Sequence, residues 1–406
     1  DPHVARVLAM GRSRAIDCIN ALGSLGICCA NGAMMVLMVV FGGTFCNYSY
    51  AFSLSLSIYG AAFFYVLFVV LHRRWNPLVP LHDFRRRDVL GVLHRQGFCT
   101  GVAWSVNYAL LLVANPFVPG LLQLVINGSG LVFVVFLSLV LLGNRYSVAQ
   151  WLCVIAVAIG GSLAMMDESE SDGDAVWVLA YAVGAWSVGL ANLLTENVMR
   201  NVRRAADCCE EPGTPLVSAV QFLCVSKLYG VPATLALAWL PRAAQGAAWS
   251  RYLGNGMRCL WLGVCSEEDR ASCADPGSEA AGLSAMWIAS TLSFITILLA
   301  AGVQRQRDAV YVGVAHSLAP VLSTIVLTQE GLMGVYYRSP RTFEVFANAV
   351  TLGGGVVYTA VTLVQERRAP RTTCLSRSFR FQPLGEVLDS AGELSLQRDA
   401  GPRRPW

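Results

Sequence analysis

Residues 96–144 read QGFCTGVAWSVNYALLLVANPFVPGLLQLVINGSGLVFVVFLSLVLLGN and contain no Asp, Glu, Lys or Arg. A helix needs roughly 20 apolar residues to cross a bilayer, so this stretch is long enough for two crossings. The segment NPFVPG at residues 115–120 breaks it near its middle, because proline and glycine end helices. A second uncharged stretch, residues 18–72, is interrupted in the same way by GGTFCN at residues 42–47. Together the two stretches predict four membrane-spanning helices.

The whole chain has the composition of an α-helical protein with many membrane spans. Of its 406 residues 55% are hydrophobic and 14% charged, and the mean hydropathy is +0.52, whereas soluble domains carry about 25% charged residues. This excludes a cytosolic enzyme, a nucleic-acid binder and a disordered protein, and the uniformly apolar runs exclude a membrane barrel. The spacing predicts ten helices, at residues 22–43, 50–71, 88–113, 117–142, 148–166, 175–198, 215–240, 282–303, 309–329 and 344–364.

Arginine placement predicts the orientation of the chain. The loops after the second, fourth, sixth and eighth helices carry arginine, and those after the first, third and fifth carry neither lysine nor arginine. Positively charged loops stay cytosolic, so both termini are expected in the cytosol. Residues 1–21 are interpreted either as a helix on the membrane surface or as a plain polar leader. The polar tail, residues 366–406, is expected to be disordered.

The chain divides into two halves of five helices, residues 22–166 and 175–365, joined by an acidic luminal linker at 167–174. Each half crosses the membrane an odd number of times, so the second is inverted relative to the first. Inverted repeats are the architecture of many secondary transporters, whose substrate site lies at the repeat interface near mid-membrane. Ten helices without internal symmetry are the alternative.

Three ionisable residues of the predicted spans are candidates for function. Lys227, the only lysine, is near the middle of its helix, where a charge costs at least about 3 kcal/mol. It is expected to face a water-filled cavity and bind an anionic group or tune pKa values there, unless it lies closer to the surface. Glu196 is either a proton-coupling or cation-binding carboxylate or a solvated charge at a helix end. The two lie roughly 13 Å apart in depth, too far to pair. His316 either titrates near pH 6.5 or bonds a neighbouring helix.

Neutral polar residues complete the predicted cavity. Gln123, Asn127 and Ser129 form a polar patch in the fourth helix, which is alternatively a helix-packing surface. The predicted substrate-binding cavity comprises Gln123, Asn127, Ser129, Asn107, Asn192, Lys227, His316, Ser317 and Tyr358, with Glu196 and His316 as proton-coupling candidates. Asn31 and Asn348 are further single polar residues within spans.

Thirteen cysteines are scattered along the chain, and three lie in the long luminal loop at residues 241–281. An oxidising lumen would allow a disulfide among Cys259, Cys265 and Cys273, leaving one of them unpaired within the loop. Neither this group nor the pair Cys208 and Cys209 has a histidine at zinc-site spacing. No hydrolase, metalloprotease or phosphate-binding motif is present, so neither an enzyme nor a cofactor or metal site is predicted.

Several short motifs occur in a common order along residues 45–365. They are Asn47-Tyr48-Ser49, Leu122-Gln123-Leu124, Arg145-Tyr146, Trp151-Leu152, Asn192 with Glu196, Asn255-Gly256 with Cys259-Leu260 and Leu262-Gly263, Ala319-Pro320, and Gly354-Gly355 with Tyr358. In these motifs the chain resembles the chloroquine-resistance transporter family of the drug/metabolite transporter superfamily. The resemblance implies ten helices in two inverted halves around a central cavity.

The resemblance also implies a function. It implies a carrier in the membrane of a lysosome- or digestive-vacuole-like acidic organelle, exporting amino acids, small peptides or cationic drugs, often with protons. Related plastid proteins move glutathione-like thiols. The family's glutamate in the sixth helix corresponds to Glu196, and one loop disulfide, Cys259–Cys273, is implied.

The chain departs from the family at several positions. Carboxylates of the third and eighth helices in some members are here Cys99 and Ile295, and Lys227 has no counterpart. Proton coupling and substrate therefore stay open. A membrane-embedded transferase and a non-transporting scaffold or receptor are the rival interpretations. The transferase would need acids or histidines gathered at one membrane face, and the scaffold would leave no cavity.

Overall fold

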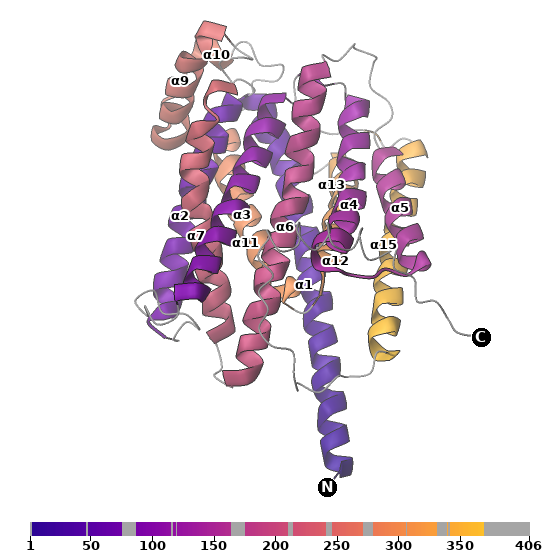
Figure 1. Cartoon of the computed structure of the whole chain (residues 1–406). Helices are drawn as coiled ribbons and strands as arrows, with labels where there is room; N and C mark the ends of the chain where they lie inside the picture. The colour runs from indigo at the N-terminus through magenta and orange to yellow at the C-terminus, as the bar shows by residue number, and fades with distance from the viewer. Residues whose placement is uncertain are drawn as a thin grey trace, which may run out of the picture.

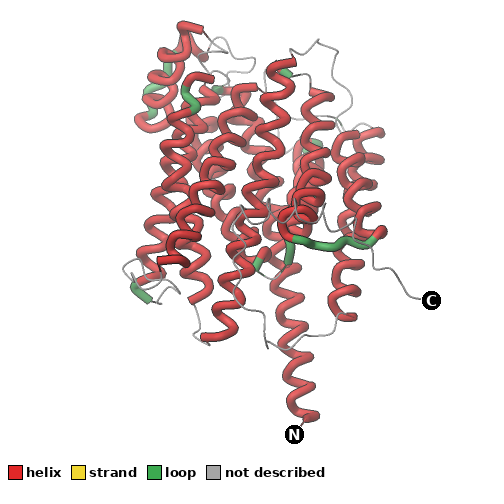
Figure 2. The backbone as a smooth tube through the Cα atoms, in the orientation of Figure 1, coloured by secondary structure: helices red, strands yellow, loops and turns green. Residues whose placement is uncertain are grey.

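A computed structural model of the chain describes residues 2–45, 48–74, 87–114, 117–118, 120–163, 175–209, 214–240, 246–270, 279–305, 307–330, 339 and 342–368. These residues form helices joined by short connections, and none of them forms a strand (Figure 2). The acidic linker at 167–174, Cys273 and the tail beyond residue 368 lie outside the described residues.

The helices pack together as a bundle (Figure 1). Their bounds are α1 Pro2–Thr44, α2 Ser49–His72, α3 Arg87–Ala114, α4 Gly120–Leu142, α5 Val148–Leu163, α6 Ala175–Cys209, α7 Thr214–Ala236, η4 Gly246–Ala248, α9 Trp249–Leu262, α10 Glu267–Arg270, α11 Glu279–Gln304, α12 Ala309–Ser317, α13 Ala319–Leu327 and α15 Thr342–Arg368. Each of the ten ranges predicted from the sequence falls on one of these helical segments, so the all-helical class is confirmed.

Eight helical segments within the described part of the chain are long and apolar enough to cross a membrane. They are Cys18–Met38, Ser49–His72, Leu93–Ala114, Ala175–Arg200, Val217–Ala236, Ala280–Gln304, Ala309–Leu327 and Val345–Gln365. Two shorter apolar segments, Ser129–Leu142 and Val148–Gly160, occupy the places of the fourth and fifth predicted spans. The protein is therefore a multi-pass membrane protein.

Three helices differ from the sequence prediction by more than a few residues. The helix α6 continues to Cys209, past the predicted end at residue 198, so Glu196 lies within the helix and not at its end. The helix α1 begins at Pro2, so the leader at 1–21 and the first predicted span form one continuous helix. The predicted helix at 309–329 is divided at Leu318 into α12 and α13, with Pro320 in the first turn of α13. Proline has no backbone N–H to donate and its ring crowds the preceding turn, so the ladder of hydrogen bonds is interrupted there.

The loop between α7 and α11 contains helix α9 and a disulfide. Cys259 is bonded to Cys265, so a loop disulfide is confirmed but the pairing with Cys273 is wrong. The physical reason is local: α9 ends at Gly263, whose φ of 69° lies in the left-handed region that favours glycine and turns the chain back. The Cα atoms of the two cysteines are consequently 4.2 Å apart.

The bundle is held together by helix pairs that are distant in sequence. In the middle of Figure 1, α3 packs against α6, and α7 lies against α3 and α2. On the other side α4 packs against α6 and α5, and α5 packs against α15. The helix α1 lies along α11 and α13. These contacts join the two halves of the chain, since each of α6, α7, α11, α13 and α15 packs against a helix of the first half.

The contact between α3 and α7 depends on small residues. A Cβ atom added at Gly101 would lie 2.2 Å from the carbonyl oxygen of Ser226. Nearby, the Ser105 hydroxyl donates to the carbonyl oxygen of Gly230 at 2.8 Å. Close backbone approach through small residues is the usual way in which helices associate in lipid.

Candidate functional site

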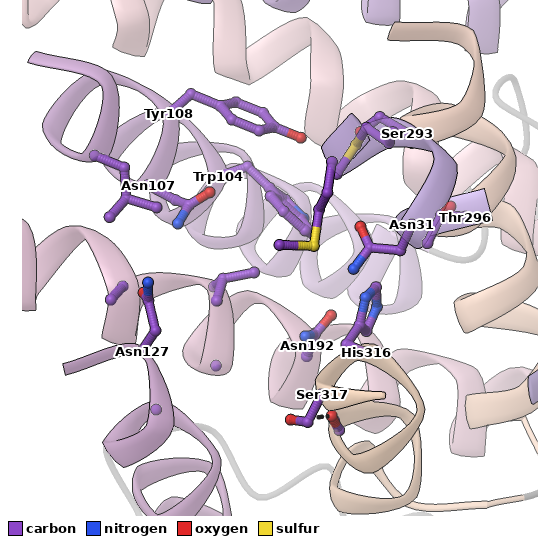
Figure 3. A pocket seen from close by; sticks show the side chains of 18 of the residues that line it. Asn31, Trp104, Asn107, Tyr108, Asn127, Asn192, Ser293, Thr296, His316 and Ser317 are labelled. Carbon is purple, nitrogen blue, oxygen red and sulfur yellow. Dashed lines mark hydrogen bonds between the residues drawn. The ribbon is translucent and has the colours of Figure 1, made fainter. Parts of the chain in front are cut away.

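A cavity of about 470 Å³ lies in the middle of the bundle. Its walls come from α1 to α6, α11, α12 and the first turn of α13, so both halves of the chain contribute. Five residues predicted from the sequence line it, namely Asn107, Asn127, Asn192, His316 and Ser317. Figure 3 shows Asn192, His316 and Ser317 grouped on one side of the cavity and Asn107 and Asn127 on the other.

The other predicted cavity residues lie elsewhere. Ser129 accepts a hydrogen bond from the Trp186 indole at 3.0 Å and donates to the carbonyl oxygen of Ile126. Tyr358 is fully buried in a hydrophobic cluster and is not among the residues that line the cavity. Gln123 lies on α4, but its side chain is outside the described residues. Ser129 and Tyr358 therefore serve packing between helices, because neither side chain reaches the cavity.

Several lining residues were missed by the sequence analysis or given little weight. Trp104 and Tyr108 form an aromatic wall, and Ser293 and Thr296 of α11 add hydroxyl groups. Asn31 of α1, which the sequence shows as a single polar residue in a span, also lines the cavity. The spacing of Trp104, Asn107 and Tyr108 at helical intervals on α3 was the available signal.

The polar side chains of the cavity differ in whether they form hydrogen bonds within the protein. Asn107 donates to the Gly184 carbonyl oxygen at 2.9 Å and Asn127 to the Tyr181 hydroxyl at 2.9 Å. The side chains of Asn31, Asn192 and His316 have no hydrogen-bond partner among the described residues. Because buried polar groups in proteins are nearly always hydrogen-bonded, these two amides and the imidazole remain available to water or a ligand.

One helical turn beyond Asn192, α6 carries a buried polar network, which we call the Glu196 network. Glu196 is fully buried and forms an ion pair with Arg200. Its Oε2 accepts the backbone N–H of Ala309 at 2.6 Å, and its Oε1 accepts from Asn144 Nδ2 at 3.4 Å. Arg200 in turn donates to Asn144 Oδ1 at 3.0 Å. The network thus ties α6 to the α4–α5 turn and to the start of α12.

Asp308 extends the Glu196 network to the first turn of α12. As the N-cap of that helix, it accepts the backbone N–H of Tyr311 at 2.8 Å. Burial raises the pKa of the Asp308 carboxyl above its usual value, although that hydrogen bond and the nearby cations Arg200 and Arg307 act in the opposite direction. Burial also raises the pKa of the Tyr146 hydroxyl, and the negative charge of Asp308 adds to this effect.

Lys227 lies behind the aromatic wall and outside the cavity itself. Its side chain is 4% exposed, and its Nζ lies 4.9 Å from the Trp104 ring centroid and 5.2 Å from that of Tyr108. The ring of Phe294 is 5.9 Å from the same nitrogen. Glu196 is paired with Arg200 and not with Lys227, and the separation in depth between Glu196 and Lys227 stays a prediction. The ammonium is thus one aromatic ring away from the cavity.

Comparisons with known proteins bear on the fold. No family model matches the chain, and no curated protein matches it. A solved structure described only as a crystal structure of a protein is similar over 86% of this chain and 99% of its own, with a TM-score of 0.52 and 16% sequence identity. At this identity the similarity shows a shared helical fold and carries nothing about activity.

Proposed function

We propose that this chain is a secondary active transporter that moves small organic solutes, such as amino acids or small peptides, by alternating access. The observation that carries the proposal is the polar-lined cavity in the middle of an otherwise apolar bundle. Ligand sites of transporters lie near mid-membrane between helices. A non-transporting scaffold would instead bury its polar residues against neighbouring helices, and Asn31, Asn192 and His316 are not buried in this way.

Ten crossings in two inverted halves form part of the proposal. If α1 to α5 correspond in order to α6, α7, α11, α12 with α13, and α15, the helix contacts exchange as a two-fold axis requires. The pair α1 and α11 corresponds to α6 and α3, and the pair α4 and α6 corresponds to α12 with α13 and α1. The leading helices α1 and α6 each place one asparagine, Asn31 and Asn192, in the cavity.

The Glu196 network supplies the proposed gate at one end of the cavity. It joins three elements by an ion pair and hydrogen bonds, all of which can break and re-form without refolding any helix. Alternating access needs such a two-state contact on one side of a fixed site. Glu196 and His316 remain the proposed carriers of a coupled proton, since they lie one turn beyond the cavity and within it, respectively.

The membrane and its sidedness are proposals that follow from the arginine pattern and the resemblance to the chloroquine-resistance transporter family. In Figure 1 the N-terminal end of α1 and the helix α9 lie at opposite ends of the bundle. This arrangement suits a cytosolic N-terminus and a disulfide-bearing luminal loop in an acidic organelle. A glutathione-like thiol carrier of the same superfamily and a membrane-embedded transferase are the alternatives.

Transport can be tested with the purified full chain reconstituted in liposomes. The panel comprises labelled amino acids, dipeptides and a cationic drug, each with a neutral and with an acidic lumen. Uptake above that of protein-free liposomes supports the carrier. No flux of any compound under either condition would overturn it. Conversion of a labelled donor substrate without flux would favour the transferase.

A further inference from the structure

The charge of the cavity indicates which solutes it can hold. Among its described lining residues the polar groups are amides, hydroxyls and one imidazole, and none is Asp, Glu, Lys or Arg. A cationic solute in a low-dielectric site needs a carboxylate or an equivalent set of acceptors. The described lining provides no such carboxylate.

The nearest carboxylate identified in the site is already occupied. Glu196 lies one turn beyond Asn192 and is bonded to Arg200, to the Ala309 N–H and to Asn144. Binding a cationic solute would require these bonds to break, and it would leave the Arg200 guanidinium without its carboxylate. In the arrangement that the structure describes, Glu196 therefore stabilises the network and does not provide a counter-charge for the cavity.

Lys227 places a positive charge directly behind the cavity wall. Its ammonium contacts the faces of Trp104, Tyr108 and Phe294, and it has no carboxylate partner among the described residues. Cation–π contacts stabilise an ammonium without cancelling its charge. Because Trp104 and Tyr108 also line the cavity, the field of the ammonium reaches a bound solute through a single ring in a medium of low dielectric.

We propose that the cavity selects solutes that carry a carboxylate and no net positive charge, with Asn31, Asn192 and His316 binding the polar group and Lys227 supplying the attractive charge from behind Trp104 and Tyr108. The inference rests on the proposed carrier function and narrows its substrate class. It excludes the cationic drugs that the family resemblance implies. Asn31 and Asn192 each offer an amide N–H to a carboxylate, and His316 offers a third donor.

Three dipeptides that differ only in side-chain charge test the proposal. Alanylglutamate is net negative, alanylglutamine neutral and alanyllysine net positive, and the uptake of each is measured in liposomes containing the full chain. We expect alanylglutamate to be preferred over alanyllysine by about tenfold or more, the scale of one partly screened charge interaction. Preferred uptake of alanyllysine, or of a cationic drug, would overturn the inference and leave the carrier function standing. Absence of all uptake would overturn both.

Two variants locate the origin of the preference. Lys227→Met keeps the length of the side chain and removes the charge, so the ratio of alanylglutamate to alanyllysine uptake should fall towards one while alanylglutamine uptake persists. Lys227→Arg should keep the ratio. An unchanged ratio in a folded Lys227→Met protein, as judged by its melting temperature, contradicts the role of Lys227.

A gain of charge in the cavity provides a test that does not depend on the folding of Lys227→Met. Asn31→Asp places a carboxylate among the lining groups and should reverse the preference towards alanyllysine. Asn348→Asp makes the same change on α15, where Asn348 does not line the cavity, and should leave the ratio unchanged. Equal ratios in the two variants would contradict the proposal.

Discussion

Glu196 shows how one side chain can hold three elements of a helical bundle together. Its two carboxylate oxygens are shared between Arg200 and Asn144 on one side and the Ala309 N–H on the other. The donors around this buried carboxylate form charge-assisted hydrogen bonds with it. The sequence placed Glu196 near a helix end, but the contacts to Asn144 and Ala309 depend on packing that brings distant segments together.

Glu196→Gln removes the charge and leaves one oxygen to accept the Ala309 N–H. We expect the variant to lose about 1–2 kcal/mol of stability. This is less than the loss expected for a fully buried ion pair, because the Arg200 side chain is 34% exposed. Thermal melting of the detergent-solubilised protein measures this. Arg200→Lys, which keeps a positive charge, is the matched control. A melting temperature equal to that of the wild type would show that the ion pair adds nothing to the fold.

Asp308→Asn tests the pH dependence of the first turn of α12. Asparagine also caps helices well, so the variant removes the titratable group and keeps the cap. Because burial raises the pKa of Asp308 in the folded protein, its ionisation opposes folding, and its contribution to stability falls as pH rises from about 4, the pKa of an unfolded aspartate. The melting temperature of the wild type minus that of the variant should therefore decrease with rising pH. A difference that increases with pH contradicts the expected sign.

At the scale of elements, the crossing of α3 and α7 tolerates no added volume. Gly101→Ala would force its Cβ to within 2.2 Å of the Ser226 carbonyl oxygen. We expect a loss of about 1–3 kcal/mol of stability as the helices move apart. Gly91→Ala on the same helix meets no atom within 4 Å, so it should be neutral or stabilising by up to about 1 kcal/mol. Melting temperatures of the two variants in parallel give the comparison, and an equally stable Gly101→Ala protein would contradict it.

The sequence predicts which segments form helices, but it predicts where the helices end only in part. Runs with few or no charges located the predicted helical segments, since the cost of burying charge in lipid is large compared with any local propensity. The division at Leu318 and the turn at Gly263 were missed, because both depend on local backbone geometry. Cys265 reaches Cys259 only after that turn, and spacing alone does not distinguish it from Cys273.

At the scale of the whole molecule, the Glu196 network should open during each transport cycle. A reducible cross-link between cysteines placed at Asn144 and Arg200 would hold the α4–α5 turn against α6. We expect the cross-linked protein to lose net uptake, because the cavity can then open on one side only, and we expect reduction to restore it. The reduced protein is its own control for the loss of the two side chains. Full uptake in the cross-linked state would show that this contact is not the gate.

The sequence predicts that the spans enclose a polar cavity, but it predicts only some of the residues that line it. Polar residues in apolar spans identified Asn107, Asn127, Asn192, His316 and Ser317, because an unsatisfied polar group in lipid needs a reason. Ser129 and Tyr358 have the same signature, yet they face other helices. Which side of a helix faces a cavity is determined by the packing of several helices at once, and a single sequence does not contain that information.

The burial of Lys227 also limits which lysine-directed reactions can modify this chain. It is the single lysine in these 406 residues and is 4% exposed. While the bundle is folded, Lys227 is buried, so these 406 residues expose no lysine ε-amine to ubiquitin conjugation, acetylation or amine-reactive cross-linkers. A terminal amine would still react. Trypsin can cleave it only after arginine until the bundle opens. Labelling of Lys227 by an amine reagent would therefore report unfolding of the bundle directly.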